Sequence, residues 1–155
     1  KLILPARNRS ELRLHHPKEH QLHLERKLVM DLLKKLQREL NMAFLFISHD
    51  LAVVYHVSNR VGVMYLGRLV EIADTQILFK KPRHPYTKML LDAIPDLNLT
   101  GRQRIPVAGE VPSPINPPSG CPFHPRCPHT TSSCQTEKPL LRETTDRLIA
   151  CHEIE

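Results

Sequence analysis

Proline is the residue that most constrains the fold of this chain, because it is concentrated in one segment. Ten of the fourteen prolines lie between Pro95 and Pro139. Each proline fixes its own φ angle and pushes the preceding residue out of the helical region. We therefore expect an α/β part before a boundary near Pro95 and a loop-rich, cysteine-containing part, residues 96–155, after it.

Length and composition narrow the class of protein. The chain has 155 residues, of which 41% are hydrophobic and 25% charged, so its composition is not that of a disordered protein. No apolar run approaches the roughly 20 residues that a spanning helix needs, which excludes a transmembrane interpretation. We expect no signal peptide, because the start lacks a continuous apolar core followed by a small-residue cleavage site. The first residue is Lys1 rather than methionine, and we expect a fragment or a processed chain.

The net charge of +6 raises the question of nucleic-acid binding. Residues 1–40 hold ten Lys or Arg and five Asp or Glu, whereas residues 41–155 hold twelve and eleven. The basic residues are therefore concentrated near the start of the chain, where no aromatic residue precedes Phe44 to stack on bases. We interpret residues 1–27 as a divergent basic segment with a solvated face or little order, and expect no nucleic-acid partner.

A helix followed by a strand is predicted after this segment. Between Glu25 and Leu40 the leucines recur at helical spacing, and Asn41 can cap the helix end. The continuous apolar run at 42–47 then predicts a strand buried on both faces, as in a parallel sheet. His49 would stand at the carboxyl end of this strand, where α/β sheets bind ligands.

The remaining elements of the α/β part are short. Asp50 can cap a helix at 51–58, and residues 61–72 predict two strands joined by a tight turn at Gly67. Asp74 opens a helix through Phe79. Pro85 occupies the first turn of another helix that Pro95 closes.

Five separated sequence motifs, taken in this order, resemble those of one protein family. They are FLFISHDLAVV at 44–54, VMYLGRLVEI at 63–72, HPYT at 84–87, GEVPSP at 109–114 and GCPFHPRCP at 120–128. The first two resemble the carboxyl-terminal third of the ATPase subunit of ABC transporters. The others are similar to the extension found in its oligopeptide and dipeptide import branch. The resemblance runs from about Leu28 to Cys151.

This resemblance implies an α/β fold: the C-terminal portion of a P-loop ABC-type nucleotide-binding domain at 28–95, then the importer extension at 96–155. It also implies ATP and Mg²⁺ as cofactors, and as partners a second ATP-binding subunit and permease subunits at the cytoplasmic face of the cell membrane. His49 matches the family's switch histidine, which contacts the γ-phosphate. An imidazole can donate to a phosphoryl oxygen as charge redistributes. A helix cap alone accounts for Asp50.

Several parts of such an ATPase are missing from the 155 residues. No glycine is followed by lysine, as a P-loop requires, and the family's signature loop and the paired Walker B acids are also absent. We therefore expect the chain to be a truncated or frame-disturbed derivative that does not hydrolyse ATP alone. ATP turnover by the purified chain above a no-protein control would contradict this expectation.

Four cysteines, Cys121, Cys127, Cys134 and Cys151, are separated by five, six and sixteen residues. In an intracellular chain such cysteines indicate a metal before disulfides, but their spacing identifies no metal. Four thiolates can hold Zn²⁺ or a [4Fe–4S] cluster. The family resemblance favours the iron–sulfur cluster, with unliganded buried thiols and zinc as alternatives.

Two functions of different classes follow. The first is part of the energy-coupling subunit of a peptide importer, in which ATP binding closes two such subunits and hydrolysis reopens them. The alternative is a non-enzymatic metal-binding interaction domain. Nucleotide binding discriminates between them.

Overall fold

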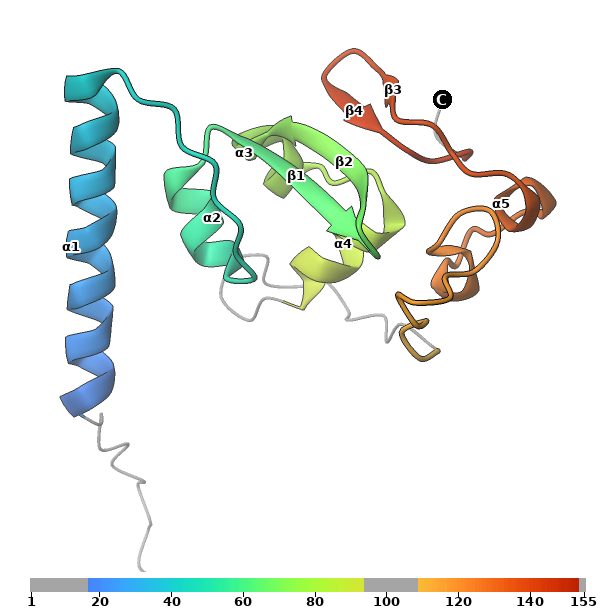
Figure 1. Ribbon diagram of the computed structural model, residues 1–155, viewed down its shortest axis with the longest axis horizontal. Coiled ribbons are helices and arrows are strands. Elements are labelled where there is room, and N and C mark those ends of the chain that lie inside the picture. Colours follow the sequence, from blue (N-terminus) through green and yellow to red (C-terminus); the bar gives the residue numbers. More distant parts are fainter. Residues whose placement is uncertain (1–16, 94–108, 154–155) are drawn as a thin grey trace, which may run out of the picture. The chain divides into compact units, whose positions relative to one another are not determined.

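A computed structural model describes residues 17–93 and 109–153. The chain divides into two compact units, Lys1–Leu45 and Phe46–Glu155. The first contains helix α1 (Pro17–Leu40), and the second begins with helix α2 (Leu51–Val57) (Figure 1). None of the helices in the described ranges is both long and apolar enough to span a membrane.

Helix α1 confirms the helix predicted from Glu25 to Leu40 and begins earlier, at Pro17. It ends as expected at Asn41, whose φ of 50° is left-handed. The N–H of Met42 donates to the Gln37 carbonyl at 3.2 Å. This bond and the left-handed residue form the usual helix stop in which free carbonyls of the last turn find donors.

The buried parallel strand predicted at 42–47 is wrong. These residues form no strand, and the side chains of Leu45 and Ile47 are 91% and 95% exposed. A strand buried on both faces needs a neighbouring strand on each side and a layer over each face. The sheet of the described residues does not include this segment. His49 consequently does not stand at the end of a parallel strand.

The hairpin predicted at 61–72 is confirmed. Strands β1 (Arg60–Tyr65) and β2 (Arg68–Asp74) pair antiparallel. Between them Leu66 and Gly67 have φ angles of 45° and 76°. Positive φ at both central residues matches the right-handed twist of the strands, and glycine adopts it without steric cost. Along β1 every second side chain is buried, which places one face of the hairpin on the core.

The end of the chain completes this sheet. Strands β3 (Arg142–Glu143) and β4 (Arg147–Ile149) extend it in the order β1-β2-β4-β3, with every pair antiparallel. The mixture of helices and strands agrees with the expected α/β composition, but the observed sheet is antiparallel. Strands β3 and β4 have two and three residues, too few to show periodicity, so no sequence pattern predicted them.

Two further helices were expected from the sequence, and a third, α5, was not. Helices α3 (Thr75–Lys80) and α4 (Pro85–Asp92) confirm the short helices after Asp74 and at Pro85. Helix α5 (Ser132–Thr136) and a 3₁₀ turn (His124–Arg126) interrupt the otherwise irregular segment 109–141, whose irregularity the prolines predicted. The predicted boundary and helix end at Pro95 lie outside the described residues.

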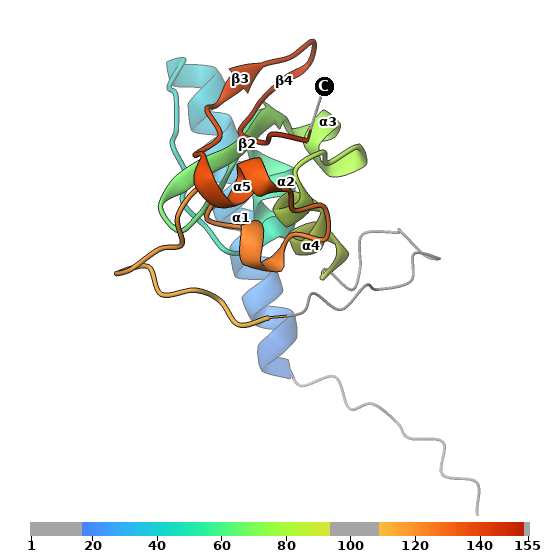
Figure 2. The ribbon, with the colours of Figure 1, turned by 90° about the vertical axis from the view of Figure 1, so that its right-hand side faces the viewer.

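One hydrophobic core joins the hairpin, α3, α4 and the cysteine-bearing segment, residues 109–153. Figure 2 views this unit from the side of the cysteine-bearing segment, with α5 in front. Phe123, from the cysteine-bearing segment, is 1% exposed. Its ring lies 5.3 Å from that of Tyr65 on β1 and 5.5 Å from that of Tyr86 on α4, measured between centroids. Such tilted and edge-on pairs suit the aromatic quadrupoles. The loop-rich part is therefore packed against the hairpin rather than standing apart from it.

Candidate functional site

His49 and Asp50 immediately precede helix α2. The carboxylate of Asp50 accepts hydrogen bonds from the N–H groups of Ala52 and Val53 at 3.1 and 3.2 Å. This geometry confirms Asp50 as the helix cap. The side chain of His49 is exposed. It is therefore accessible to a ligand.

The four predicted metal ligands are brought together by the fold, although they come from distant positions. Cys121, Cys134 and Cys151 are buried, Cys127 is half-buried, and all four are free thiols. They lie close enough to influence one another: a negative charge on any one of the four sulfurs raises the pKa of at least one of the others. We call these four residues the cysteine quartet.

Burial is the largest influence on the pKa of three members of the quartet. It raises the pKa of the Cys121, Cys127 and Cys151 thiols, because a thiolate loses its hydration there. Backbone N–H groups oppose this effect. The N–H groups of Phe123 and His124 lower the pKa of Cys121 by hydrogen bonding.

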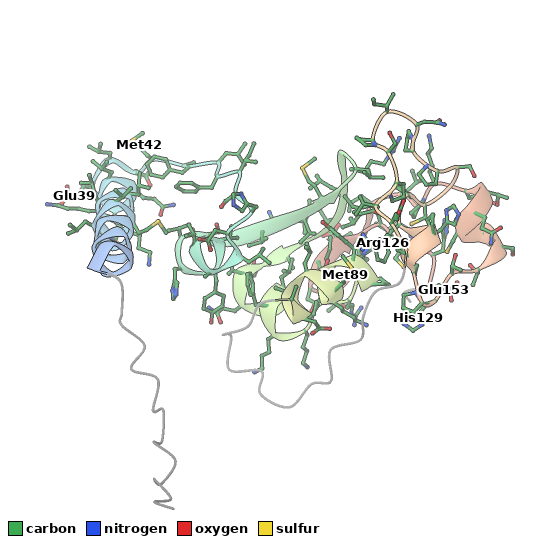
Figure 3. All side chains as sticks on the ribbon, turned by 90° about the horizontal axis from the view of Figure 1, so that it is seen from below. Glu39, Met42, Met89, Arg126, His129 and Glu153 are labelled. Carbon is green, nitrogen blue, oxygen red and sulfur yellow. The ribbon has the colours of Figure 1, made fainter. Side chains whose placement is uncertain are left out.

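The other three sulfurs also have hydrogen-bonding neighbours. Backbone groups of His129 and Glu153 form hydrogen bonds with the sulfurs of Cys127 and Cys151, respectively, and lower their pKa. The hydroxyl of Thr131 lies 3.3 Å from the sulfur of Cys134. Figure 3 labels His129 and Glu153, whose side chains lie in this part of the chain. The carboxylate of Glu153 raises the pKa of Cys127 and Cys151, as a nearby negative charge should.

A close backbone approach holds Cys121 next to Cys134. The N–H of Cys121 donates to the carbonyl of Cys134 at 2.8 Å, and the Ser119 hydroxyl donates to the carbonyl of Gln135 at 2.8 Å. Gly120 lies between these bonds with a φ of 66°. A Cβ there would stand 2.4 Å from the Cys134 carbonyl oxygen. Only glycine fits this position.

These contacts define how well a metal fits. Sulfurs that accept backbone hydrogen bonds, as those of Cys121, Cys127 and Cys151 do, suit thiolate ligands, because donors and a cation both favour the charged sulfur. In the parts of the chain that the structure describes, however, no three or more His, Cys, Asp or Glu side chains are grouped closely enough to hold a metal ion. The donor set therefore fits thiolate ligation in its chemistry, whereas the side-chain positions do not yet enclose an ion.

A buried ion pair between strands β2 and β4 was not anticipated from the sequence. Arg147 on β4 and Glu71 on β2 meet through Nη1 and Oε1 at 2.6 Å, and their side chains are 1% and 0% exposed. The Glu71 carboxylate also accepts from the backbone N–H groups of Arg83 and His84, each at 3.0 Å. Alternation of apolar residues along β2 could not have revealed a partner 76 positions away.

The guanidinium of Arg147 is fully engaged. It donates to the Lys81 carbonyl at 2.7 Å and, through two nitrogens, to both carboxylate oxygens of Asp146. The hydrogen bond to Asp146 is the largest of the causes that raise the pKa of Arg147 above its ordinary value, and Glu71 adds to it. Arg147 thus stays charged at every physiological pH.

His84 is the third buried polar residue of this region. Its Nδ1 accepts a hydrogen bond from the Tyr86 N–H at 3.1 Å and caps helix α4. Burial lowers the pKa of His84 to about 4, although Glu71 and the backbone of Ala150 oppose this shift. The imidazole is therefore neutral at pH 7, which leaves Nδ1 free to accept.

Comparison with known proteins shows what this chain is similar to. Residues 70–134 match the model described as "Oligopeptide/dipeptide transporter, C-terminal region". The chain is 52% identical over 130 residues to the dipeptide transport ATP-binding protein DppF of Haemophilus influenzae, covering 82% of this chain and 39% of that protein. It is 47% identical over 128 residues to the oligopeptide transport ATP-binding protein AppF of Bacillus subtilis, covering 80% and 39%.

A third relative, the dipeptide transport ATP-binding protein DppF of Escherichia coli, is 46% identical over 128 residues, which cover 82% of this chain and 38% of that protein. The chain spans less than half the length of the curated relatives it matches. Residues 70–134 match the C-terminal region of oligopeptide/dipeptide transporters, and the chain resembles the C-terminal portion of ATP-binding subunits of peptide ABC transporters.

Proposed function

We propose that this chain is part of the ATP-binding, energy-coupling subunit of an ABC-type oligopeptide or dipeptide importer. The observation that carries the proposal is the identity of 46–52% over about four fifths of the chain to ATP-binding proteins of dipeptide and oligopeptide transport. Under this proposal residues 28–95 belong to a P-loop ABC-type nucleotide-binding domain, residues 96–155 form the importer extension, and residues 1–27 are divergent.

His49 is the residue to which we assign a role in ATP hydrolysis. It is exposed and lies next to a helix cap that fixes the backbone at Asp50. A donor at this position would contact the γ-phosphate of a bound nucleotide and hold the attacking water. The 155 residues contain no P-loop, signature loop or paired acids, so ATP and Mg²⁺ would be held largely by groups outside them.

The proposed partners follow from the same assignment. A second ATP-binding subunit would face the nucleotide, and permease subunits would receive the motion at the cytoplasmic face of the membrane. Closure on ATP and reopening after hydrolysis would couple the chemistry to transport. The peptide would be chosen by other subunits, since the described residues bind no part of it in this scheme.

A chimera tests this function directly. The segment of the E. coli dipeptide transport protein DppF that aligns with this chain is replaced by the corresponding residues of this chain, in a strain that lacks its own DppF and requires a dipeptide for growth. We expect growth on the dipeptide. A chimera that accumulates normally but supports no growth would contradict the proposal.

The same chimera isolates the role of His49. His49→Ala should abolish growth and ATP turnover while leaving the amount of protein unchanged. His56→Ala is the matched control, because His56 is an exposed histidine on the neighbouring helix α2. Equal growth of both variants would remove His49 from the mechanism.

For the cysteine quartet we propose a [4Fe–4S] cluster with a structural role, ahead of unliganded thiols and of Zn²⁺. The support is chemical: four cysteines that interact, three of them buried, and backbone hydrogen bonds that favour the thiolates of Cys121, Cys127 and Cys151. When bound, the cluster would cross-link four thiolates in a segment that contributes one aromatic residue, Phe123, to the core.

Metal analysis after anaerobic purification tests this second proposal. We expect stoichiometric iron and acid-labile sulfide, a loss of both in Cys134→Ser, and a lower midpoint of thermal unfolding after chelation of the iron. Colourless protein with stoichiometric zinc, or with neither metal under anaerobic conditions, would contradict the cluster.

A further inference from the structure

The fourth member of the cysteine quartet reaches the others by a different route. Cys121, Cys127 and Cys134 lie within one segment of fourteen residues, whereas sixteen residues separate Cys134 from Cys151. Cys151 follows strand β4 by one residue, Ala150. Its position therefore depends on where β4 docks.

The backbone pairing of β4 is short. Its residues pair with Glu71, Ile72 and Ala73 of β2, and the Ala150 N–H donates to the Val70 carbonyl at 2.9 Å. One more contact reaches Cys151 itself: the guanidinium of Arg142, on β3, donates to its carbonyl at 2.9 Å. A three-residue strand at this position provides few hydrogen bonds against the entropy of ordering the chain.

The Glu71–Arg147 ion pair adds further contacts that fix β4 on the hairpin. Arg147 begins β4, and its side chain enters a site where Glu71, the Lys81 carbonyl and Asp146 all accept from it. Glu71 is in turn fixed by the N–H groups of Arg83 and His84. Both charges are buried, so undocking β4 alone would leave the Glu71 carboxylate without its cation.

We propose that the buried Glu71–Arg147 ion pair positions Cys151 relative to the other three members of the cysteine quartet. Docking of β4 on the hairpin would then also complete the proposed thiolate site. By linkage, a bound metal would stabilise the docking of β4 by the same free energy by which docking stabilises metal binding. The metal half of this inference rests on the proposed thiolate site. The positioning of Cys151 does not.

Thiol alkylation tests the positioning in the reduced, metal-free, full chain. Each cysteine is followed by mass spectrometry during reaction with iodoacetamide. In Glu71→Gln and Arg147→Met we expect Cys151 to react at least about tenfold faster than in the parent, with Cys121 and Cys134 changing less than about threefold, because only β4 opens. Glu39→Gln, which removes an exposed ion pair with Lys35, is the control and should change no rate.

Two results would overturn the proposal. Unchanged alkylation of Cys151 would show that β4 docks without the pair, and equal acceleration of Cys121, Cys134 and Cys151 would show that the pair supports the whole unit. Should a single variant not fold, the double variant Glu71→Met with Arg147→Met removes both buried charges. It should fold and still expose Cys151 selectively if hydrogen bonds from the pair set the position of β4.

Cobalt(II) titration under anaerobic conditions tests the metal half. Absorption from thiolate-to-cobalt charge transfer reports ligation, and we expect Glu71→Gln to weaken cobalt binding about tenfold or more relative to the parent and to Glu39→Gln. Parent protein that binds no cobalt, combined with selective alkylation in the variants, would reject the thiolate site and retain the positioning role. Equal cobalt affinity in parent and variant would reject the coupling.

Discussion

The hairpin region, residues 60–92, and the cysteine-bearing region, residues 109–153, are held together in different ways. In the hairpin region strands pair with their neighbours, a two-residue turn fits their twist, and burial alternates along β1. The cysteine-bearing region has short elements only. It depends on one aromatic ring and a buried ion pair that reach the hairpin region, and on one glycine that lets residues 120 and 134 approach each other. Local order thus dominates the first region and distant contacts the second.

The largest test of this difference is Phe123→Ala. Phe123 is the one aromatic side chain that the described cysteine-bearing region places in the core, against Tyr65 and Tyr86. Its truncation should lower the free energy of unfolding by about 4 kcal/mol. Urea unfolding followed by circular dichroism measures the loss. Val111→Ala, at an exposed apolar side chain of the same region, should change it by less than about 0.5 kcal/mol.

Two glycines with positive φ provide the next test. Gly120→Ala places a Cβ against the Cys134 carbonyl and should cost about 3 kcal/mol, whereas Gly67→Ala, with open space at its Cβ, should cost about 1 kcal/mol from the left-handed backbone alone. Thermal unfolding of both variants gives the comparison. Equal losses would mean that the close approach of residues 120 and 134 contributes nothing.

Acid should weaken the contact between the two regions through His84. Its pKa is lowered to about 4 by burial, with Lys88 also lowering it and Glu71 opposing. In the unfolded chain the imidazole therefore becomes protonated near pH 6.5, whereas in the folded chain it stays neutral until the pH approaches 4. Stability is retained above pH 6.5 and falls as the pH drops toward 4, by at most about 3 kcal/mol.

A variant separates this histidine from the carboxylates that also titrate in acid. His84→Asn keeps a side-chain acceptor at the helix cap but cannot titrate. The free energy of unfolding, measured by urea at pH 7.0 and pH 4.5, should fall less in this variant than in the parent. An identical pH dependence would exclude His84 as the source.

The same contrast explains what the sequence could predict. The hairpin, helix α1 and the caps at Asn41 and Asp50 follow from periodicity and single-residue preferences, which act within a few positions. The apolar run at 42–47 misled the prediction, because a buried strand is defined by neighbours that its own sequence does not contain. His49 and the four cysteines were recognised from sequence motifs that resemble the family and from their residue types.

The remainder of the candidate site had no local signal. Glu71, in a strand, reads as an ordinary solvent-facing acid, and only the approach of Arg147 from the end of the chain explains why it is buried. Likewise, Gly120 gains its importance from the carbonyl of Cys134. Contacts between residues far apart in sequence are fixed by the fold as a whole, so patterns in a short window cannot reveal them.

Two aspartates that the sequence treats alike give the smallest and most local test. Asp50 and Asp74 both precede short helices, yet only Asp50 has a side chain that accepts the N–H groups of the first turn. Asp50→Ala should therefore cost about 1 kcal/mol and speed amide exchange in α2, while Asp74→Ala should change stability by less than about 0.5 kcal/mol. Equal effects would show that charge near the helix start, rather than the hydrogen bonds of the cap, stabilises these helices, because both aspartates supply the same charge.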